Sequence, residues 1–147
     1  MTKKQKTVAK ILELKGFTKE QLEAEVRKAN IKLRDEEERL IELDQEFQDR
    51  SDELARKQDS GEVAVHEMDL YCNFFKHLGK LIEQQQAIVA IRSHELDGLQ
   101  QAMVAAYREQ RLLEKLQDKI RNEQIRGAGQ IEQKQADYQF LTRKGLK

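Results

Sequence analysis

The chain has 147 residues, of which 37% are charged, and it contains no Trp, no Pro and only seven Gly. So few turn-forming residues exclude a compact fold made of many short elements. Lys and Arg together number 27, as do Asp and Glu, and the resulting net charge of zero disfavours a protein whose main task is to bind nucleic acid.

The first arm of the chain covers about residues 5–58 and shows a helical pattern. Its apolar residues fit one ladder with alternating spacings of four and three: Val8, Leu12, Leu22, Val26, Ala29, Leu33, Leu40, Leu43, Phe47 and Leu54. A mean spacing of 3.5 keeps these side chains on a seam that faces a partner helix. Thr18 and Gln21 match a capping box, but the ladder keeps its phase there, so we expect one continuous helix with a weak point at Gly16.

The second arm follows a turn at about residues 59–62, where Ser60 and Gly61 can end one helix before the next begins. Its ladder runs through Tyr71, Phe75, Leu78, Ile82, Gln85, Val89, Arg92, Leu96, Leu99, Met103, Ala106, Gln110, Leu113, Gln117, Ile120 and Gln124. Two glycines in the segment 126–129 each cost roughly 1 kcal/mol of helix stability, so we expect fraying or a hinge there.

These patterns predict an all-α protein, an antiparallel two-helix coiled-coil hairpin with unequal arms. We expect a single hairpin over residues 1–147, with helix one at about 5–58 and helix two at about 63–142. Pairing outward from Gly61 places Leu12 opposite the region near residue 110. Residues from about 119 onward then form a C-terminal overhang without an internal partner, which is either partly disordered or bound by another protein.

The sequence contains no pattern that indicates catalysis or a cofactor. A two-helix hairpin has no enclosed pocket, and no phosphate-binding loop, GxSxG or HExxH motif is present. His66, His77, His94 and Cys72 do not have the spacing of a zinc site. We therefore expect no enzymatic activity, no metal and no cofactor. A single cysteine, and the lack of a long apolar segment or signal peptide, favour a cytoplasmic location.

A second apolar row lies beside the seam of the second arm. Phe74, Leu81 and Ile88 recur every seven residues and, together with Tyr71 and Leu78, widen the apolar surface near the turn. One interpretation is a wider seam. The other is an exposed face that docks another protein, with aromatic anchors at its centre.

The same region carries a family resemblance. Residues 71–85 (YCNFFKHLGKLIEQQ) and 112–116 (LLEKL) resemble the FliJ family, the stalk proteins of the flagellar type III export apparatus. The run EQKQAD at residues 132–137 is similar to the C-terminal signature of that family. The length of the chain and its unequal hairpin also fit. Injectisome stalk proteins of the YscO type share this architecture and remain an alternative.

The resemblance implies a function and a set of partners. FliJ-like proteins insert their paired helix ends into the central pore of a hexameric flagellar export ATPase. They also contact the cytoplasmic domain of the export-gate membrane protein and escort export substrate chaperones. A protein of this kind has no catalytic chemistry of its own and lies in the cytoplasm, peripherally at the inner face of the cell membrane.

The resemblance also implies two sets of binding residues. The Tyr-x-x-Phe-x-x-x-Leu pattern assigns gate binding to Tyr71, Phe74 and Leu78, with Leu81 beside them and Phe47 at a comparable level on the first arm. For the ATPase, location near the open end and positive charge suggest Lys10, Arg121, Arg126 and Lys134. The weak points at Gly16 and at residues 127–129 put the rigidity of that end in doubt.

Two further hypotheses come from the residues alone. A generic coiled-coil adaptor, such as a homodimer in which two chains pair their overhangs, would also bury the polar C-terminal helix. A binder of membrane surfaces or nucleic acid could use the basic segments at residues 1–10 and 141–147, although the zero net charge counts against it.

Overall fold

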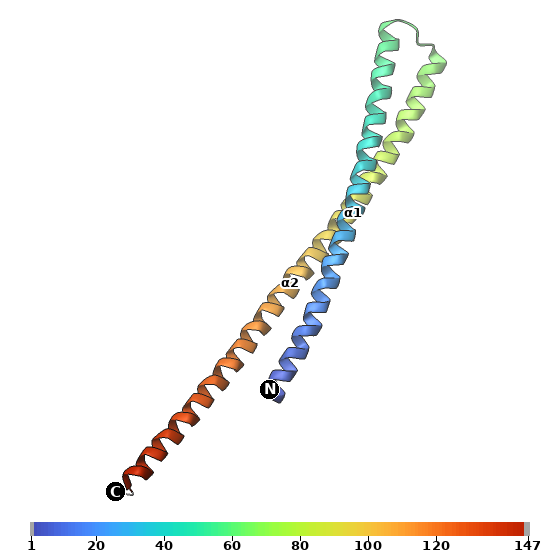
Figure 1. Ribbon diagram of the computed structural model, residues 1–147. Helices are drawn as coiled ribbons and strands as arrows, with labels where there is room; N and C mark the ends of the chain where they lie inside the picture. Colours follow the sequence, from blue (N-terminus) through green and yellow to red (C-terminus); the bar gives the residue numbers. More distant parts are fainter. Residues whose placement is uncertain (1, 146–147) are drawn as a thin grey trace. The chain divides into compact units, whose positions relative to one another are not determined.

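The computed structural model describes residues 2–145, and the side chains of residues 2–143. Two helices account for nearly all of this range: α1 (Lys3–Asp59) and α2 (Val65–Gly145). The helices pack side by side and run in opposite directions, and the described residues contain no strand (Figure 1). The predicted all-α helical hairpin is confirmed.

The connection between the helices is a Schellman motif at the end of α1. Gly61 has a positive φ of 72°, the left-handed conformation that glycine adopts without steric cost. The Glu62 N–H donates to the Lys57 carbonyl (3.1 Å) and the Gly61 N–H donates to the Gln58 carbonyl (3.2 Å), which satisfies two of the last carbonyls of the helix. The segment 62–64 follows, and α2 begins at Val65.

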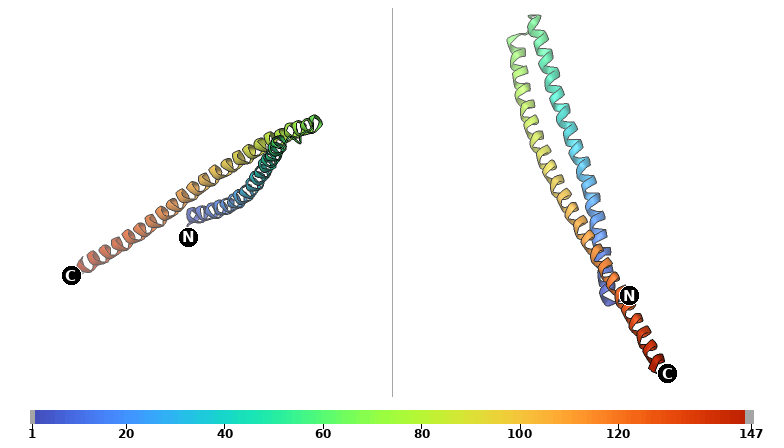
Figure 2. Two further views of the ribbon diagram at one scale, coloured as in Figure 1. Left: turned by 90° about the horizontal axis from the view of Figure 1, so that it is seen from above. Right: turned by 90° about the vertical axis from the view of Figure 1, so that its left-hand side faces the viewer.

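The contacts divide the chain into two compact units, and each unit contains a part of both helices. Unit 1 comprises Met1–Gln21 and Met103–Lys147, and unit 2 comprises Leu22–Ala102. Unit 2 therefore holds the turn and the helical segments that adjoin it. Unit 1 holds the N-terminal part of α1 and the C-terminal part of α2 (Figure 2).

The seam of unit 2 follows the predicted ladder. Its buried members are Val26, Leu43, Leu78, Gln85 and Leu96. Gln85 is the polar member, and its side-chain amide donates to the backbone carbonyl (2.9 Å) and the carboxylate (2.5 Å) of Glu36. Glu36 and Gln85 both interrupt the apolar ladder, and the hairpin pairs these two interruptions with each other.

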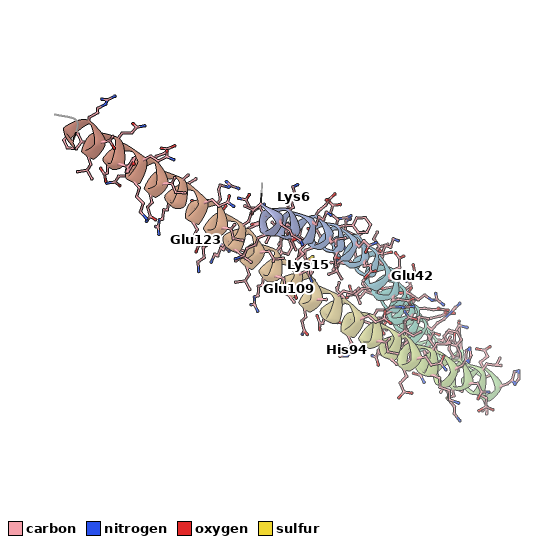
Figure 3. All side chains as sticks on the ribbon, turned by 90° about the horizontal axis from the view of Figure 1, so that it is seen from below. Lys6, Lys15, Glu42, His94, Glu109 and Glu123 are labelled. Atoms are coloured by element: carbon pink, nitrogen blue, oxygen red, sulfur yellow. The ribbon has the colours of Figure 1, made fainter. Side chains whose placement is uncertain are left out.

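The seam of unit 1 is closed by aliphatic residues and polar pairs. Val8, Ala106 and Ile120 are buried. Lys15 forms an ion pair with Glu109 (2.7 Å), and the two labelled side chains meet between the helices in Figure 3. This pairing agrees with the predicted position of Leu12 opposite the region near residue 110.

The predicted start of the overhang, at about residue 119, is wrong. Ile120 is only 5% exposed. Gln124 Oε1 accepts a hydrogen bond from Gln5 Nε2 (2.5 Å), and Gln124 Nε2 donates one to Thr2 Oγ1 (3.1 Å). The long side chains of Gln5 and Gln124 extend the pairing of the two helices beyond residue 119, the limit obtained by counting residues outward from Gly61. All residues from 128 to 143 are exposed, so the overhang begins after Gly127.

A capping box stands at the beginning of α1 and not at Thr18, where the sequence pattern suggested one. The Gln5 N–H donates to Thr2 Oγ1 (3.3 Å), and the Thr2 N–H donates to Gln5 Oε1 (3.2 Å). Thr18, the predicted alternative cap, instead donates its hydroxyl to the Leu14 carbonyl (3.1 Å) inside a continuous helix. The preferred interpretation of an unbroken helix through Gly16 is therefore the one observed.

No hinge interrupts α2 at residues 126–129. The helix continues through Gly127 and Gly129 to Gly145. Glycine weakens a helix by only about 1 kcal/mol per residue, and no proline is present to remove a backbone donor. The two glycines therefore lower the local stability without breaking the helix.

Candidate docking surfaces

An aromatic cluster connects the two helices of unit 2 near the turn. Phe75 is its central ring, with ring centroids 5.0 Å from Phe47 on α1, 5.9 Å from Phe74 and 6.2 Å from Tyr71. Tilted and edge-on contacts at these separations are favourable because the positive edge of one ring meets the negative face of another. The cluster fixes the positions of three of the five predicted gate-binding residues.

The five predicted gate-binding residues differ in how far they reach the surface. Phe47 is 37% exposed, and Tyr71, Phe74 and Leu81 are half-buried. Leu78 is only 2% exposed. Its side chain fills the seam between the helices, so it supports the surface from beneath and offers no atoms for direct contact.

Two cations of α1 cover the rings of this cluster. The Arg50 guanidinium lies 5.8 Å from the centroid of Phe74, and the Lys57 ammonium lies 5.4 Å from that of Tyr71. Such cation–π contacts are worth about 0.5–1 kcal/mol at exposed sites. Together with Leu70 and Glu67, these residues line a shallow groove on the surface of unit 2. We name it the aromatic groove, lined by Arg50, Lys57, Glu67, Leu70, Tyr71 and Phe74.

The charges around the aromatic groove form one network. Arg50 pairs with Glu53 at 2.7 Å. This hydrogen bond, with a second from Tyr71, lowers the pKa of Glu53, and it raises the pKa of Arg50. A hydrogen bond to Tyr71 raises the pKa of Lys57. These pKa shifts favour the charged forms of Arg50, Lys57 and Glu53.

Sequence reasoning missed Phe75, Arg50 and Lys57 as parts of this surface. Phe75 is a member of the predicted seam, and Arg50 falls at the seam position between Phe47 and Leu54, where the ladder lacks an apolar residue. A cation at a seam position, opposite a run of aromatic residues, is the signal that could have identified Arg50. The rings of α2 provide a surface on which such a cation can rest.

The four predicted ATPase-binding residues all lie in unit 1 and are all exposed. Lys10 is on α1, and Arg121, Arg126 and Lys134 are on α2. Arg121 and Arg126 are five residues apart, so they point about 140° away from each other around the helix. The structure does not bring these four residues into one cluster.

The end of α2 combines exposed apolar and polar side chains. Ile131, Tyr138 and Leu141 are 59%, 73% and 65% exposed. A shallow groove at this end is lined by Ile131, Lys134, Gln135, Tyr138 and Gln139. A helix that leaves large apolar side chains in water has room for a partner protein on that surface.

The zero net charge of the chain hides a strong separation of charge between the units. Unit 1 contains sixteen Lys or Arg and eight Asp or Glu, for a formal charge of +8. Unit 2 contains eleven Lys or Arg and nineteen Asp or Glu, for a formal charge of −8. Each unit therefore attracts partners of the opposite sign.

The described part of the chain has neither a metal-binding cluster nor a membrane-spanning helix. No group of three or more His, Cys, Asp or Glu among residues 2–145 is arranged to hold a metal ion. Neither described helix contains a stretch long and apolar enough to cross a membrane.

The chain matches the model of a known protein family. The family model described as "Flagellar FliJ protein" matches residues 5–140 of the chain. No curated protein and no solved structure shows a significant similarity to it. The matched range covers most of α1 and α2, including the aromatic groove and the first part of the exposed end of α2.

Proposed function

Because the chain belongs to the FliJ family, whose members are stalk proteins of the flagellar export apparatus, we propose that it links the export ATPase to the export gate. In this proposal unit 1 contacts a hexameric ATPase, and unit 2 contacts the cytoplasmic domain of the gate membrane protein. The chain acts by contact alone, without catalytic chemistry. The family match favours this flagellar role over that of an injectisome stalk.

The observation that carries the proposal is the separation of the two candidate surfaces. All four ATPase candidates lie in unit 1, and all five gate candidates lie in unit 2. One long helical hairpin can therefore hold two different partners at once, because neither set of residues is needed for the other contact.

The ATPase contact is assigned to the exposed end of α2 and the cations near it. A helix that lacks a partner after Gly127 can enter a pore without unpacking the seam of the hairpin. The formal charge of +8 on unit 1 would draw this end toward an acidic surface, and added salt would weaken that step. Lys10, Arg121, Arg126 and Lys134 point in different directions, as contacts inside a ring of six subunits require.

The gate contact is assigned to the aromatic groove. Tyr71 and Phe74 present ring surface there, and Arg50 and Lys57 provide charged edges. Phe47 and Leu81 extend the apolar area on either side. Leu78 holds the rings in place from within the seam.

The proposal also includes the export substrate chaperones that the family escorts. Their contact is not assigned to particular residues of this chain. Binding to the gate would hold the chain peripherally at the inner face of the cell membrane.

The first experiment measures ATP hydrolysis by a purified flagellar-type export ATPase with and without the chain. We expect stimulation by the full chain and its loss when residues 128–147 are deleted. The deletion point lies after Gly127, so the buried Ile120 and the bonded Gln124 keep their partners. A matched control, Phe74→Ala with Leu81→Ala, leaves unit 1 intact and should stimulate as well as the full chain.

No stimulation at any ratio, with the chain shown to be helical by circular dichroism, would contradict the ATPase assignment. Equal stimulation by the truncated chain would remove the exposed end of α2 from the contact.

The second experiment measures binding to the purified cytoplasmic domain of the gate protein by calorimetry. We expect Phe74→Ala with Leu81→Ala to abolish binding while helicity stays nearly unchanged. The matched control is Ile131→Ala with Tyr138→Ala, which removes exposed apolar area from unit 1 and should bind normally. Unfolding of the Phe74 and Leu81 double variant would instead make these side chains structural members of the seam.

A further inference from the structure

One face of α2 in unit 1 carries only positive charge over 19 residues. Its five cations are exposed, and at 3.6 residues per turn they fall within about 80° of the helix circumference. We name this face the cationic stripe: Arg108, Arg111, Lys115, Lys119 and Arg126. Within residues 2–143, none of the five forms an ion pair with a carboxylate.

One face of α1 in unit 2 carries only negative charge over the same length. Six carboxylates between residues 35 and 53 also fall within about 80° of the helix circumference. We name this face the acidic stripe: Asp35, Glu38, Glu42, Glu46, Asp49 and Glu53. Glu42 and Glu53 pair with Arg39 (3.5 Å) and Arg50 (2.7 Å) at its edge, while the side chains of Asp35, Glu38 and Glu46 are exposed.

The two stripes match in length and spacing and are opposite in sign. Each spans 19 residues, or about 27 Å of helix. In both stripes the charges recur three or four residues apart, except for the step of seven residues from Lys119 to Arg126. Like charges are therefore direct neighbours over most of each stripe, an arrangement that destabilises a helix. A partner of opposite charge removes this repulsion.

The cationic stripe does not face the other helix of its own unit, and the acidic stripe reaches α2 only at its end, where Glu53 is hydrogen-bonded to Tyr71. The seam of unit 1 uses Ala106, Gln110 and Ile120, and that of unit 2 uses Leu43 and Leu40, all outside the stripes. Apart from Glu53, the stripes therefore lie on the outer faces of the hairpin.

We propose that the cationic stripe of one chain docks on the acidic stripe of a second copy of the same chain. The match in length, spacing and charge lies within this one sequence, which favours a second copy as the occupant. An exposed apolar residue flanks each stripe, Leu112 (67% exposed) beside the cationic stripe and Ile41 (65% exposed) beside the acidic stripe, and both would be covered. This contact goes beyond the export function and does not depend on it.

Self-association through these stripes must weaken with salt. At about 0.05 M salt charges interact over more than 10 Å, and at about 0.5 M over only a few ångströms. Sedimentation velocity of the full chain should give a mass above the 17.3 kDa of one chain at the lower salt concentration. At the higher concentration it should give the mass of one chain. A single chain at both concentrations would overturn the proposal.

Charge reversal of each stripe makes the test specific. One variant carries Asp35→Lys, Glu38→Lys and Glu46→Lys, and the other carries Arg111→Glu, Lys115→Glu and Lys119→Glu. Each variant alone should sediment as a single chain at low salt, because it keeps only one intact stripe: the altered acidic stripe has a net charge of zero, and the altered cationic stripe has a net charge of −1. An equimolar mixture should associate, since the first chain keeps the cationic stripe and the second keeps the acidic stripe.

A control variant separates the effect of the acidic stripe on association from the effect of the net charge. Asp69→Lys, Glu83→Lys and Asp97→Lys reverse three exposed carboxylates on α2 of unit 2, outside both stripes, and should leave association unchanged. Dissociation of this variant, or failure of the mixture to associate, would contradict the proposal. So would a chain that stays single at low salt but binds poly-glutamate through the cationic stripe, since the occupant would then be another acidic protein. Circular dichroism verifies that every variant is helical.

Discussion

Unit 1 and unit 2 share one seam periodicity but differ in what fills the seam and in what covers the outside. Unit 2 packs a four-ring aromatic cluster and one buried glutamine, whereas unit 1 closes its seam with Val8, Ala106 and Ile120 and an ion pair. Their formal charges are −8 and +8. The periodicity of a helical hairpin thus determines the fold, while its outer faces remain free to specialise for different partners.

The largest expected effect is a loss of unfolding free energy when a buried side chain is shortened. It tests whether the seams of unit 1 and unit 2 contribute equally to stability. Leu78→Ala removes the most deeply buried side chain of unit 2 and should cost about 3 kcal/mol of unfolding free energy. Ile120→Ala in unit 1 should cost less, because the exposed helix beyond Gly127 lets the nearby backbone relax. Urea unfolding followed by circular dichroism measures both. Equal losses would show that the seams do not differ in strength.

The next effect tests the contribution of the aromatic cluster. Phe75→Leu keeps an apolar side chain but removes three ring contacts, and should cost about 1–2 kcal/mol. Tyr107→Leu in unit 1 removes a more exposed ring, which has a cation–π contact with Lys19 (4.7 Å), and should cost less. Thermal unfolding of the two variants should rank them in this order, and the reverse order would contradict the central role of Phe75.

A smaller effect concerns the ion pair across the seam of unit 1. Lys15 and Glu109 are 42% and 56% exposed, so solvent screens their attraction. Lys15→Met should cost at most about 0.5 kcal/mol, and the difference from the unaltered chain should shrink as salt is added. A loss above 2 kcal/mol that salt does not change would mean that Lys15 acts through packing.

The smallest effect is a pH dependence confined to unit 2. The pKa of Glu53 is lowered by its hydrogen bonds with Arg50 and Tyr71. Its contribution to stability is therefore present above the unfolded-state pKa and is lost as pH falls through the lower folded-state pKa. An NMR titration should place the Glu53 midpoint below that of an ordinary glutamate. Arg50→Gln should raise this midpoint, and an unchanged midpoint would remove Arg50 as the cause.

Much of the fold followed from periodicity. Every predicted seam position of α2 from Tyr71 to Gln124 is buried or half-buried, because a 3.5-residue spacing leaves only one face available to a partner helix. The turn followed from Ser60 and Gly61. The start of the overhang could not be predicted from the sequence, because residue counting cannot show that Gln5 and Gln124 reach each other across the hairpin.

The candidate surfaces were only partly predictable. The sequence left open whether Tyr71, Phe74 and Leu81 widen the seam or form an exposed docking face, and the structure leaves each of them half-buried. The burial of Leu78 was implied by its place in the ladder, yet the family pattern grouped it with the docking residues. The separation of charge between the units was missed, because a single total for the chain cancels it.

The buried pair of Gln85 and Glu36 has a mechanical consequence. If α1 slid past α2 by seven residues within unit 2, the amide of Gln85 would face Ala29 or Leu43 in place of Glu36, and neither side chain can accept its hydrogen bond. Gln85 also donates to the backbone carbonyl of Glu36, an acceptor that residues 29 and 43 offer as well, so the slip would lose only the bond to the carboxylate. A hydrogen bond to a charged group contributes about 1.5–3 kcal/mol, so the pair favours one register of the two helices. Under the proposed function, in which the chain links two partners, this preferred register would oppose sliding of α1 along α2 within unit 2.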